Sequence, residues 1–280
     1  MDNRPIGFFD SGLGGLTCIP YLMKALPNER IVYFGDTART PYGSKAIGTI
    51  RNFAFEITDF LVSENVKMIV IACNTISATC LSELRERCPE LPILGIISPA
   101  ARKAAVSCAN GSRVGIIGTK VTIMSRAYRS KILKFLKSVA EAGQQIFEAP
   151  CPILVPLIEE GITRGDIMDL SIRHYLDGFV MKNRLDTLVL GCTHYPLIKE
   201  NISQLYPGLS IIDPSAEIIS SIEDSLSKHE SLADGADGAD GGHVFYASDL
   251  SENFVNMIDR IFEGSGFTVA FKNFDLECAI

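Results

Sequence analysis

The sequence predicts an α/β protein in which mostly parallel sheets are flanked by helices. Short apolar runs rich in β-branched residues alternate with longer helical patterns along the chain. These runs are apolar at successive positions, which is typical of strands covered on both faces. The 280 residues, of which 47% are hydrophobic, suffice for one large domain or two of ordinary size.

The individual elements follow from these two patterns. The apolar runs predict strands at 6–9, 31–34, 68–72, 93–97, 114–117, 188–190, 210–212 and 244–246. The helical patterns lie at 49–64, 78–87, 125–142, 167–182 and 217–227. The stretch 231–242, rich in Asp, Gly and Ala, has no apolar periodicity and predicts a flexible surface loop.

A faint internal repeat predicts two lobes of similar construction. The segment Ile-Gly-Phe-Phe-Asp-Ser at 6–11 resembles Val-Gly-Ile-Ile-Gly-Thr at 114–119. Each copy precedes a strand that ends at a cysteine, Cys73 in the first half and Cys192 in the second. We therefore expect two pseudo-symmetric lobes with the site in the cleft between them, although α/β chains also repeat such patterns generically. The expected lobes are 1–97 plus 212–280, and 98–211.

Charge and hydropathy exclude several classes of protein. The formal net charge of −7 argues against binding to nucleic acid or to an anionic membrane surface. No apolar run approaches the roughly 18 residues of a membrane-spanning helix, and the first residues do not resemble a signal peptide. We therefore expect a soluble, cytoplasmic protein.

The cysteines do not form a recognisable disulfide or metal pattern. The chain has eight cysteines and four histidines, with no Cys-x-x-Cys pair and no tight Cys/His cluster. We expect no metal site, and most of the cysteines are expected to be small buried hydrophobic residues. Cys73 and Cys192 differ because each ends an apolar run and is followed at once by polar residues.

Ligands of parallel sheets bind beyond the carboxyl ends of the strands. Four polar turns are predicted there: 10–15, 35–37, 73–75 and 192–194. Asn74 or Thr75 is expected to cap a helix that starts near Ser77, and Pro196 to lie in the first turn of the helix after Cys192. A helix N-terminus binds carboxylates and lowers the pKa of a nearby thiol. For Cys73 alone, a core cysteine is the competing interpretation.

Two further residues near these turns each have a functional and a structural interpretation. Asp10 ends a strand, where it either tunes a thiol or binds an ammonium group, or else caps a helix. His194 is two residues beyond Cys192, so an extended backbone would point both side chains to one side. It either assists that thiol or is a loop histidine bonded to backbone.

Paired thiols suit the inversion of a carbon centre. One thiolate removes a proton from carbon while the other thiol returns a proton to the opposite face. A proton next to a carbonyl is a weaker acid than a thiol by roughly a dozen pK units, at ~1.4 kcal/mol each. The site must therefore stabilise the carbanion and exclude water. No distinctive lysine context for a pyridoxal cofactor is present.

With these residues, the chain resembles the glutamate racemases, a family of cofactor-independent amino-acid racemases. The matching motifs span most of the sequence, in the order Asp-Ser-Gly-Leu-Gly-Gly at 10–15, Tyr-Phe-Gly-Asp at 33–36, Pro-Tyr-Gly at 41–43, Ala-Cys-Asn-Thr at 72–75, Gly-Thr at 118–119 with Thr122, Val-Pro-Leu-Ile-Glu-Glu-Gly at 155–161, and Gly-Cys-Thr-His-Tyr-Pro at 191–196.

The resemblance implies a role for each matching residue. Cys73 and Cys192 would be the two acid/base catalysts, one for each enantiomer, assisted by Asp10 and His194. The substrate-binding residues would be Ser11, Pro41, Tyr42, Gly43, Asn74, Thr75, Thr119, Thr122, Glu159 and Thr193. No cofactor and no metal would be needed. The implied product is D-glutamate for peptidoglycan, and the implied assembly is a homodimer.

Two segments depart from the family pattern. The run at 233–242 resembles an insertion, and Ala-Ser-Asp at 247–249 replaces an expected Thr-Gly or Ser-Gly pair. Two other functions remain open from the sequence: an aspartate racemase with a shorter substrate, and a non-catalytic amino-acid-binding regulatory protein.

Overall fold

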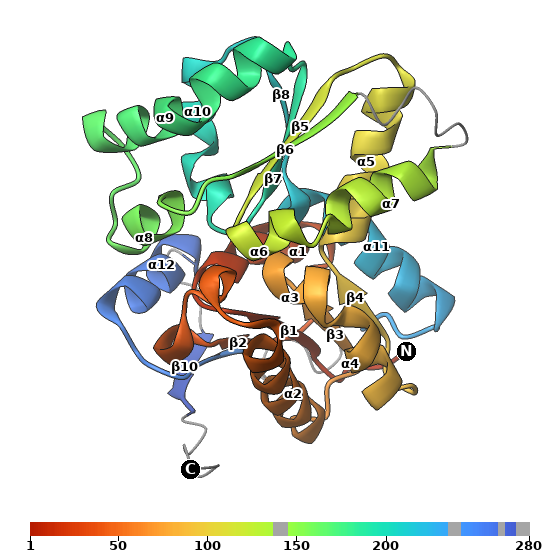
Figure 1. Ribbon diagram of the computed structural model, residues 1–280. Coiled ribbons are helices and arrows are strands. Elements are labelled where there is room, and N and C mark those ends of the chain that lie inside the picture. The colour runs from red at the N-terminus through yellow and green to blue at the C-terminus, as the bar shows by residue number, and fades with distance from the viewer. Residues whose placement is uncertain (137–144, 235–241, 263–266, 273–280) are drawn as a thin grey trace.

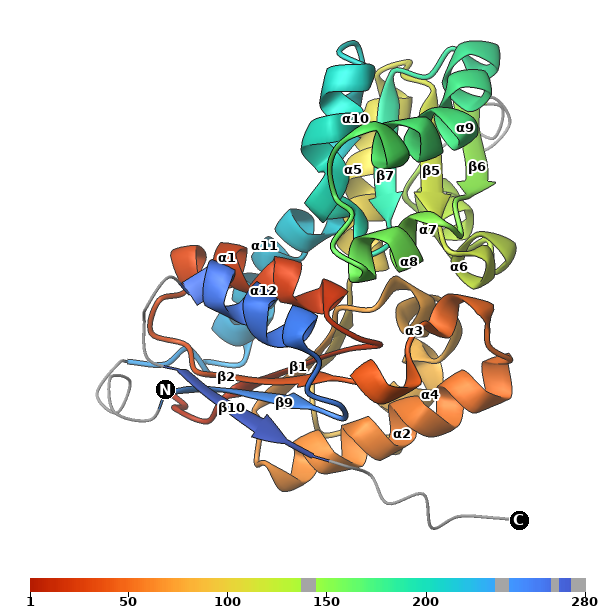
Figure 2. The same cartoon turned by 90° about the vertical axis from the view of Figure 1, so that its left-hand side faces the viewer.

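The computed structural model describes residues 1–136, 145–234, 242–262 and 267–272. It confirms the α/β class: two parallel sheets, each flanked by helices, lie in an upper and a lower lobe (Figures 1 and 2). None of the helices in the described part of the chain combines the length and hydropathy needed to span a bilayer.

The larger sheet has the strand order β10-β9-β2-β1-β3-β4. Its strands are β1 (Ile6–Asp10), β2 (Ile31–Gly35), β3 (Met68–Ile71), β4 (Ile93–Gly95), β9 (His243–Ala247) and β10 (Phe267–Phe271). The three central strands β1, β2 and β3 are buried at every position, which explains their continuous apolar sequences. Ile6 pairs with Ile31 on one side and Met68 on the other, so the three strands end at one edge.

The smaller sheet has the order β6-β5-β7-β8. Its strands are β5 (Val114–Gly118), β6 (Ile146–Pro150), β7 (Thr187–Gly191) and β8 (Ser210–Ile212). Gly118 pairs with Gly191 at the carboxyl end of the two central strands. The residues that follow, Thr119 and Cys192, therefore leave the sheet at the same edge.

Helices cover both faces of each sheet. They are α1 (Ile19–Ala25), α2 (Ile47–Ser63), α3 (Asn74–Thr79), α4 (Leu81–Arg87), α5 (Ile97–Ala109), α6 (Lys120–Met124), α7 (Ala127–Phe135), α8 (Leu154–Glu159), α9 (Asp166–Asn183), α10 (Lys199–Leu205), α11 (Pro214–Lys228) and α12 (Glu252–Phe262). Short 3₁₀ helices are η1 (Gly14–Cys18), η2 (Thr37–Arg39), η3 (Tyr42–Ser44) and η5 (Tyr195–Ile198).

One hydrophobic core connects the two lobes. Side chains of α5 and α11 belong to one hydrophobic cluster with side chains from strands of both sheets, such as Phe8 of β1 and Ile116 of β5. The opposite faces have separate cores, under α2 and α4 in the larger sheet and under α8 and α9 in the smaller one. This shared packing thus fixes the carboxyl ends of the two sheets relative to each other.

Several predicted elements need correction. The strand predicted at 93–97 ends at Gly95, and α5 begins at Ile97. The helix predicted at 78–87 is two helices, α3 and α4, which meet at Cys80. The pattern at 125–142 contains α7, and part of it, like most of the 231–242 loop, lies outside the described residues. The lobe boundaries stay a prediction.

Candidate active site

One pocket is lined by residues that follow strands of both sheets. Its walls come from the turns after β1, β2, β3, β5 and β7, together with α8. The lining residues are Ser11, Thr40, Pro41, Tyr42, Gly43, Cys73, Asn74, Thr75, Thr119, Val155, Cys192, Thr193 and His194. Three residues predicted for the site, Asp10, Thr122 and Glu159, lie behind this wall and contact it through hydrogen bonds.

Cys73 lies at the N-cap of α3 and is 3% exposed. Its Sγ donates to Oγ of Ser11 at 3.5 Å. Burial raises the pKa of the Cys73 thiol to about 12, the charge of Asp10 adds to this, and the backbone N–H of Ile76 opposes it. Cys73 therefore keeps its proton at neutral pH.

Two expectations about this helix were wrong. The helix begins at Asn74 rather than near Ser77, and neither Asn74 nor Thr75 caps it with a side-chain hydrogen bond. The helix N-terminus was expected to lower the pKa of the thiol, but the loss of solvent outweighs the helix because the sulfur is buried.

Cys192 has a different neighbour. Nδ1 of His194 lies 3.8 Å from Sγ of Cys192, and Nε2 of His194 lies 3.1 Å from Oε1 of Glu159. The chain turns between Cys192 and His194 instead of running extended, so the turn brings the two side chains together. Pro196 lies in the first turn of the following helix, as predicted, although this helix is the 3₁₀ helix η5.

His194 carries the positive charge of the pocket. Burial alone would lower the pKa of His194, but its hydrogen bonds to Cys192 and Glu159 and their charges raise it to about 10. Burial works against the Glu159 carboxylate, yet His194 and the hydroxyl of Thr40 bring the pKa of Glu159 below its usual value. The imidazolium ion of His194 lies beside Cys192, whereas Cys73 has no such partner among the contacts described.

Asp10 connects the two lobes behind the pocket. Its carboxylate accepts hydrogen bonds from the backbone N–H of Gly15 at 2.9 Å and from Oγ1 of Thr193 at 3.3 Å. Burial raises the pKa of Asp10, and the charge of His194 opposes the shift. Gly14 permits the close approach of the lobes, because a Cβ atom there would lie 2.6 Å from Nδ1 of His194.

Hydroxyl groups from both lobes meet on another wall. Oγ1 of Thr119 lies 3.0 Å from Oγ1 of Thr75 and 3.0 Å from Oγ1 of Thr122. Asn74, beside them, accepts a hydrogen bond at Oδ1 from the hydroxyl of Tyr128 at 2.7 Å. These groups form a neutral polar wall that suits a small zwitterionic or anionic ligand.

Asp36 fixes the wall that contains Pro41, Tyr42 and Gly43. Its carboxylate accepts hydrogen bonds from the hydroxyl of Tyr42, from Nε of Arg39 at 2.7 Å and from Oγ of Ser248 at 2.7 Å. Ser248 belongs to the segment that departs from the family pattern.

Four contributors to the site were not named as site residues from the sequence, although Asp36 lies in the predicted turn 35–37. Thr40 and Val155 line the pocket, and Asp36 and Ser248 support it. Thr40 directly precedes the Pro-Tyr-Gly motif, and Val155 begins another quoted motif, so position in the motifs was the available signal. In the described part of the chain, no group of three or more His, Cys, Asp or Glu side chains is arranged to hold a metal ion.

The comparisons with known proteins first give the class of protein. The sequence profile described as Asp/Glu/Hydantoin racemase matches residues 18–222. Two similar relatives are glutamate racemases: one from Geobacter metallireducens, 40% identical with 94% of each chain covered, and one from Aquifex aeolicus, 39% identical with 91% of this chain and 93% of the relative covered.

A solved structure agrees with these sequences. The glutamate racemase of Francisella tularensis, crystallised in complex with D-glutamate, superimposes with a TM-score of 0.87 and 36% identity, and 98% of this chain and 99% of that chain are covered. This chain therefore belongs to the glutamate racemase family, whose members are isomerases.

Proposed function

We propose that this protein interconverts L- and D-glutamate with Cys73 and Cys192, one of which removes the α-proton while the other delivers its own proton to the opposite face. The observation that carries the proposal is that both thiols line one pocket but differ in their charged neighbours. Cys192 has the imidazolium of His194 beside it, and Cys73 retains its proton. One sulfur is thus prepared as the base and the other as the acid.

In the proposed reaction, Cys73 and Cys192 exchange roles between the two enantiomers. The Cys192 thiolate removes the α-proton, so that the C–H bond breaks and an S–H bond forms. The Cys73 thiol delivers its proton to the opposite face, which leaves a Cys73 thiolate and inverts the centre. The other enantiomer reacts in the opposite sense, and His194 with Glu159 stabilises the charge at Cys192 in both.

The remaining wall residues would bind the substrate. The hydroxyls of Ser11, Thr75, Thr119 and Thr193 and the amide of Asn74 offer hydrogen bonds, while Pro41, Tyr42 and Gly43 close the pocket from the other side. Fixed dipoles in a pocket with little water stabilise the carbanion far better than solvent does. No cofactor is assigned to the reaction.

The test is incubation of the purified protein with L-glutamate in D₂O without added cofactor. We expect optical activity to be lost and deuterium to enter the α-position of the product. Unchanged optical activity together with no deuterium incorporation would contradict the proposal. L-aspartate is assayed in parallel, because preferential turnover of aspartate would favour the shorter substrate instead.

We further propose that the D-glutamate serves peptidoglycan synthesis in the cytoplasm and that the protein is a homodimer. Support for these proposals comes from the family alone. Light scattering after size exclusion at micromolar concentration would give twice the chain mass for a dimer, and the mass of one chain would contradict it.

A further inference from the structure

Tyr128 contacts both cysteine turns. It lies on α7 in the second lobe and is 1% exposed. Its ring packs against Gly191, which directly precedes Cys192: a Cβ atom at Gly191 would lie 3.1 Å from Cε2 of Tyr128. Its hydroxyl reaches Asn74, which directly follows Cys73, in the other lobe.

The hydrogen bond of Tyr128 fixes which way the Asn74 amide points. Oδ1 is the only acceptor in this side chain, and it accepts from the Tyr128 hydroxyl at 2.7 Å. Because burial raises the pKa of Tyr128 well above its usual value, the phenol keeps the proton that it donates. The Nδ2 group of Asn74 is therefore left on the other side of the amide.

This Nδ2 group lacks an acceptor within the described part of the chain. It is buried without a hydrogen-bond partner there, and Asn74 is 2% exposed and lines the pocket. A buried donor without a partner is unfavourable unless a ligand supplies the acceptor. An anionic oxygen is the strongest acceptor for it.

We propose that Tyr128 is a positioning residue, which holds the Asn74 amide so that Nδ2 donates to a carboxylate oxygen of the substrate. The inference rests on the proposed function, since it concerns glutamate in this pocket. The hydrogen bond crosses from one lobe to the other, so the Asn74 donor is oriented only while α7 lies against the turn that begins α3.

The test compares Tyr128→Phe with a matched variant, Tyr206→Phe, by calorimetric titration with D-glutamate and by steady-state kinetics. Tyr206 also donates its hydroxyl to a side-chain oxygen, that of Asp177 at 2.6 Å, but it is absent from the pocket lining. For Tyr128→Phe we expect Kd and KM to rise roughly five- to thirtyfold with a much smaller change in kcat. Tyr206→Phe should leave all three unchanged.

A double-mutant cycle with Asn74→Ala tests whether Tyr128 acts through Asn74. Tyr128→Phe should weaken binding in the wild-type background but cause no further loss in the Asn74→Ala background. Asn74→Asp covers the case in which Tyr128→Phe does not fold: it keeps the acceptor for Tyr128 but replaces the donor by a carboxylate, so it should abolish binding. Thermal unfolding of each variant reports its fold.

Three results would overturn the inference: unchanged binding in Tyr128→Phe, an equal loss in both backgrounds, or wild-type affinity in Asn74→Asp. The proposed function fails separately. A wild-type protein that binds D-glutamate without racemising it contradicts the function, while the binding cycle still decides the role of Tyr128. A wild-type protein that does not bind D-glutamate contradicts both.

Discussion

The two thiols of the pocket differ in the charges that surround them. Cys73 is buried beside Ser11 with the Asp10 carboxylate behind it, whereas Cys192 faces a protonated His194 that is held by Glu159. A reaction that needs one base and one acid at the same moment requires this difference. In the proposed reaction, each turnover would reverse the protonation of the two sulfurs.

Glu159→Gln tests whether the Glu159 carboxylate supports the positive charge of His194. The pKa of His194 is raised to about 10, so its imidazolium persists below that pH and is lost as the pH rises through it. Glutamine keeps a hydrogen-bond acceptor for Nε2 but removes the negative charge, so the pKa of His194 should fall. In a pH profile of kcat/KM, the alkaline limb should move to lower pH. An unmoved alkaline limb would show that Glu159 does not support the charge of His194.

Much of the pocket was predictable at residue scale because parallel strands end at one edge, which brings turns distant in sequence together. Ser11, Cys73 and Cys192 follow predicted strands in this way. The charged and buried surroundings of the two thiols were not predictable, because they come from neighbours in other segments. The contact of Tyr128 was not predictable either. A helical pattern does not show that the hydroxyl of one of its residues contacts the other lobe.

At the scale of the elements, close backbone contacts position the side chains of the site. Gly14 in η1 lies against His194 and Thr193, which belong to the turn after β7. Two of the elements that were missed have identifiable causes: β6 contains Glu148 and ends at Pro150 on the sheet edge, and the start of α5 continues the apolar run of β4. An edge strand is half exposed, so its sequence lacks the continuous apolar run of a central strand.

Gly14→Ala tests the contact between η1 and the Cys192 turn. The added Cβ would lie 2.6 Å from Nδ1 of His194 and 2.6 Å from Oγ1 of Thr193, so the turn that holds these side chains beside the pocket must shift. A displacement of this kind should lower kcat on the order of 10²-fold. The control is Gly178→Ala in α9, where a Cβ meets nothing within 4 Å. It should keep full activity and raise the free energy of unfolding by about 0.5–1 kcal/mol. Equal kinetics for the two variants would contradict the steric argument.

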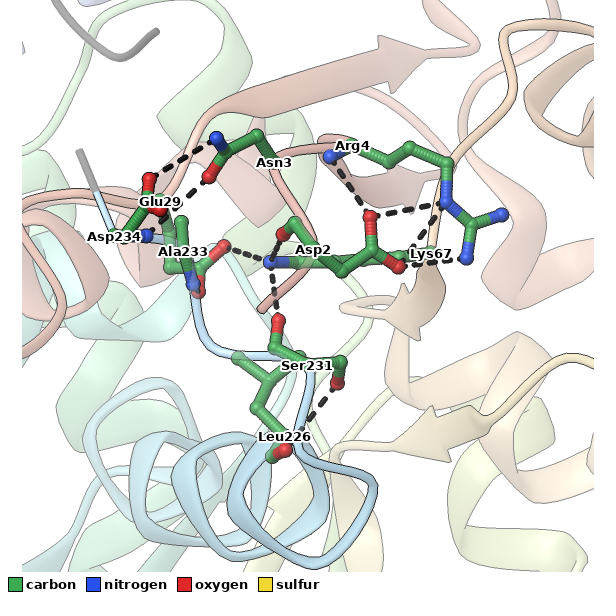
Figure 3. A network of polar contacts seen from close by, with 9 residues as sticks. All are labelled: Asp2, Asn3, Arg4, Glu29, Lys67, Leu226, Ser231, Ala233 and Asp234. Atoms are coloured by element: carbon green, nitrogen blue, oxygen red, sulfur yellow. Dashed lines mark hydrogen bonds and ion pairs between the residues drawn. The ribbon is translucent and has the colours of Figure 1, made fainter. Parts of the chain in front are cut away.

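At the scale of the whole molecule, the pocket and a stabilising ion pair lie at opposite ends of the strands of the larger sheet. The pocket follows the carboxyl ends of its strands, while a buried ion pair lies at the amino ends (Figure 3). Nζ of Lys67 lies 2.6 Å from Oε2 of Glu29 and donates to the carbonyl oxygens of Asp2 and Ser231. This pair joins the N-terminal segment and the segment that follows α11 to the sheet.

Lys67→Met should therefore destabilise the protein without changing its chemistry. The substitution leaves the Glu29 carboxylate buried and unpaired, and such losses amount to about 3–5 kcal/mol. Arg51→Met is the control, because it breaks a partly exposed pair with Glu83 at 3.1 Å and should lose less than about 1 kcal/mol. Urea unfolding gives both values. Similar losses in the two variants, or a raised KM for Lys67→Met under folded conditions, would contradict this separation.

The most direct test of the two-thiol account measures the turnover of Cys73→Ala and Cys192→Ala. Circular dichroism monitors the loss of optical activity with L-glutamate and with D-glutamate as substrate. Alanine leaves each pocket wall nearly intact but removes the group that carries the proton. The account predicts that each variant loses racemisation by at least several hundredfold, on the roughly 10²–10⁴ scale of positioned acid–base groups. Near-wild-type turnover in either variant would contradict it.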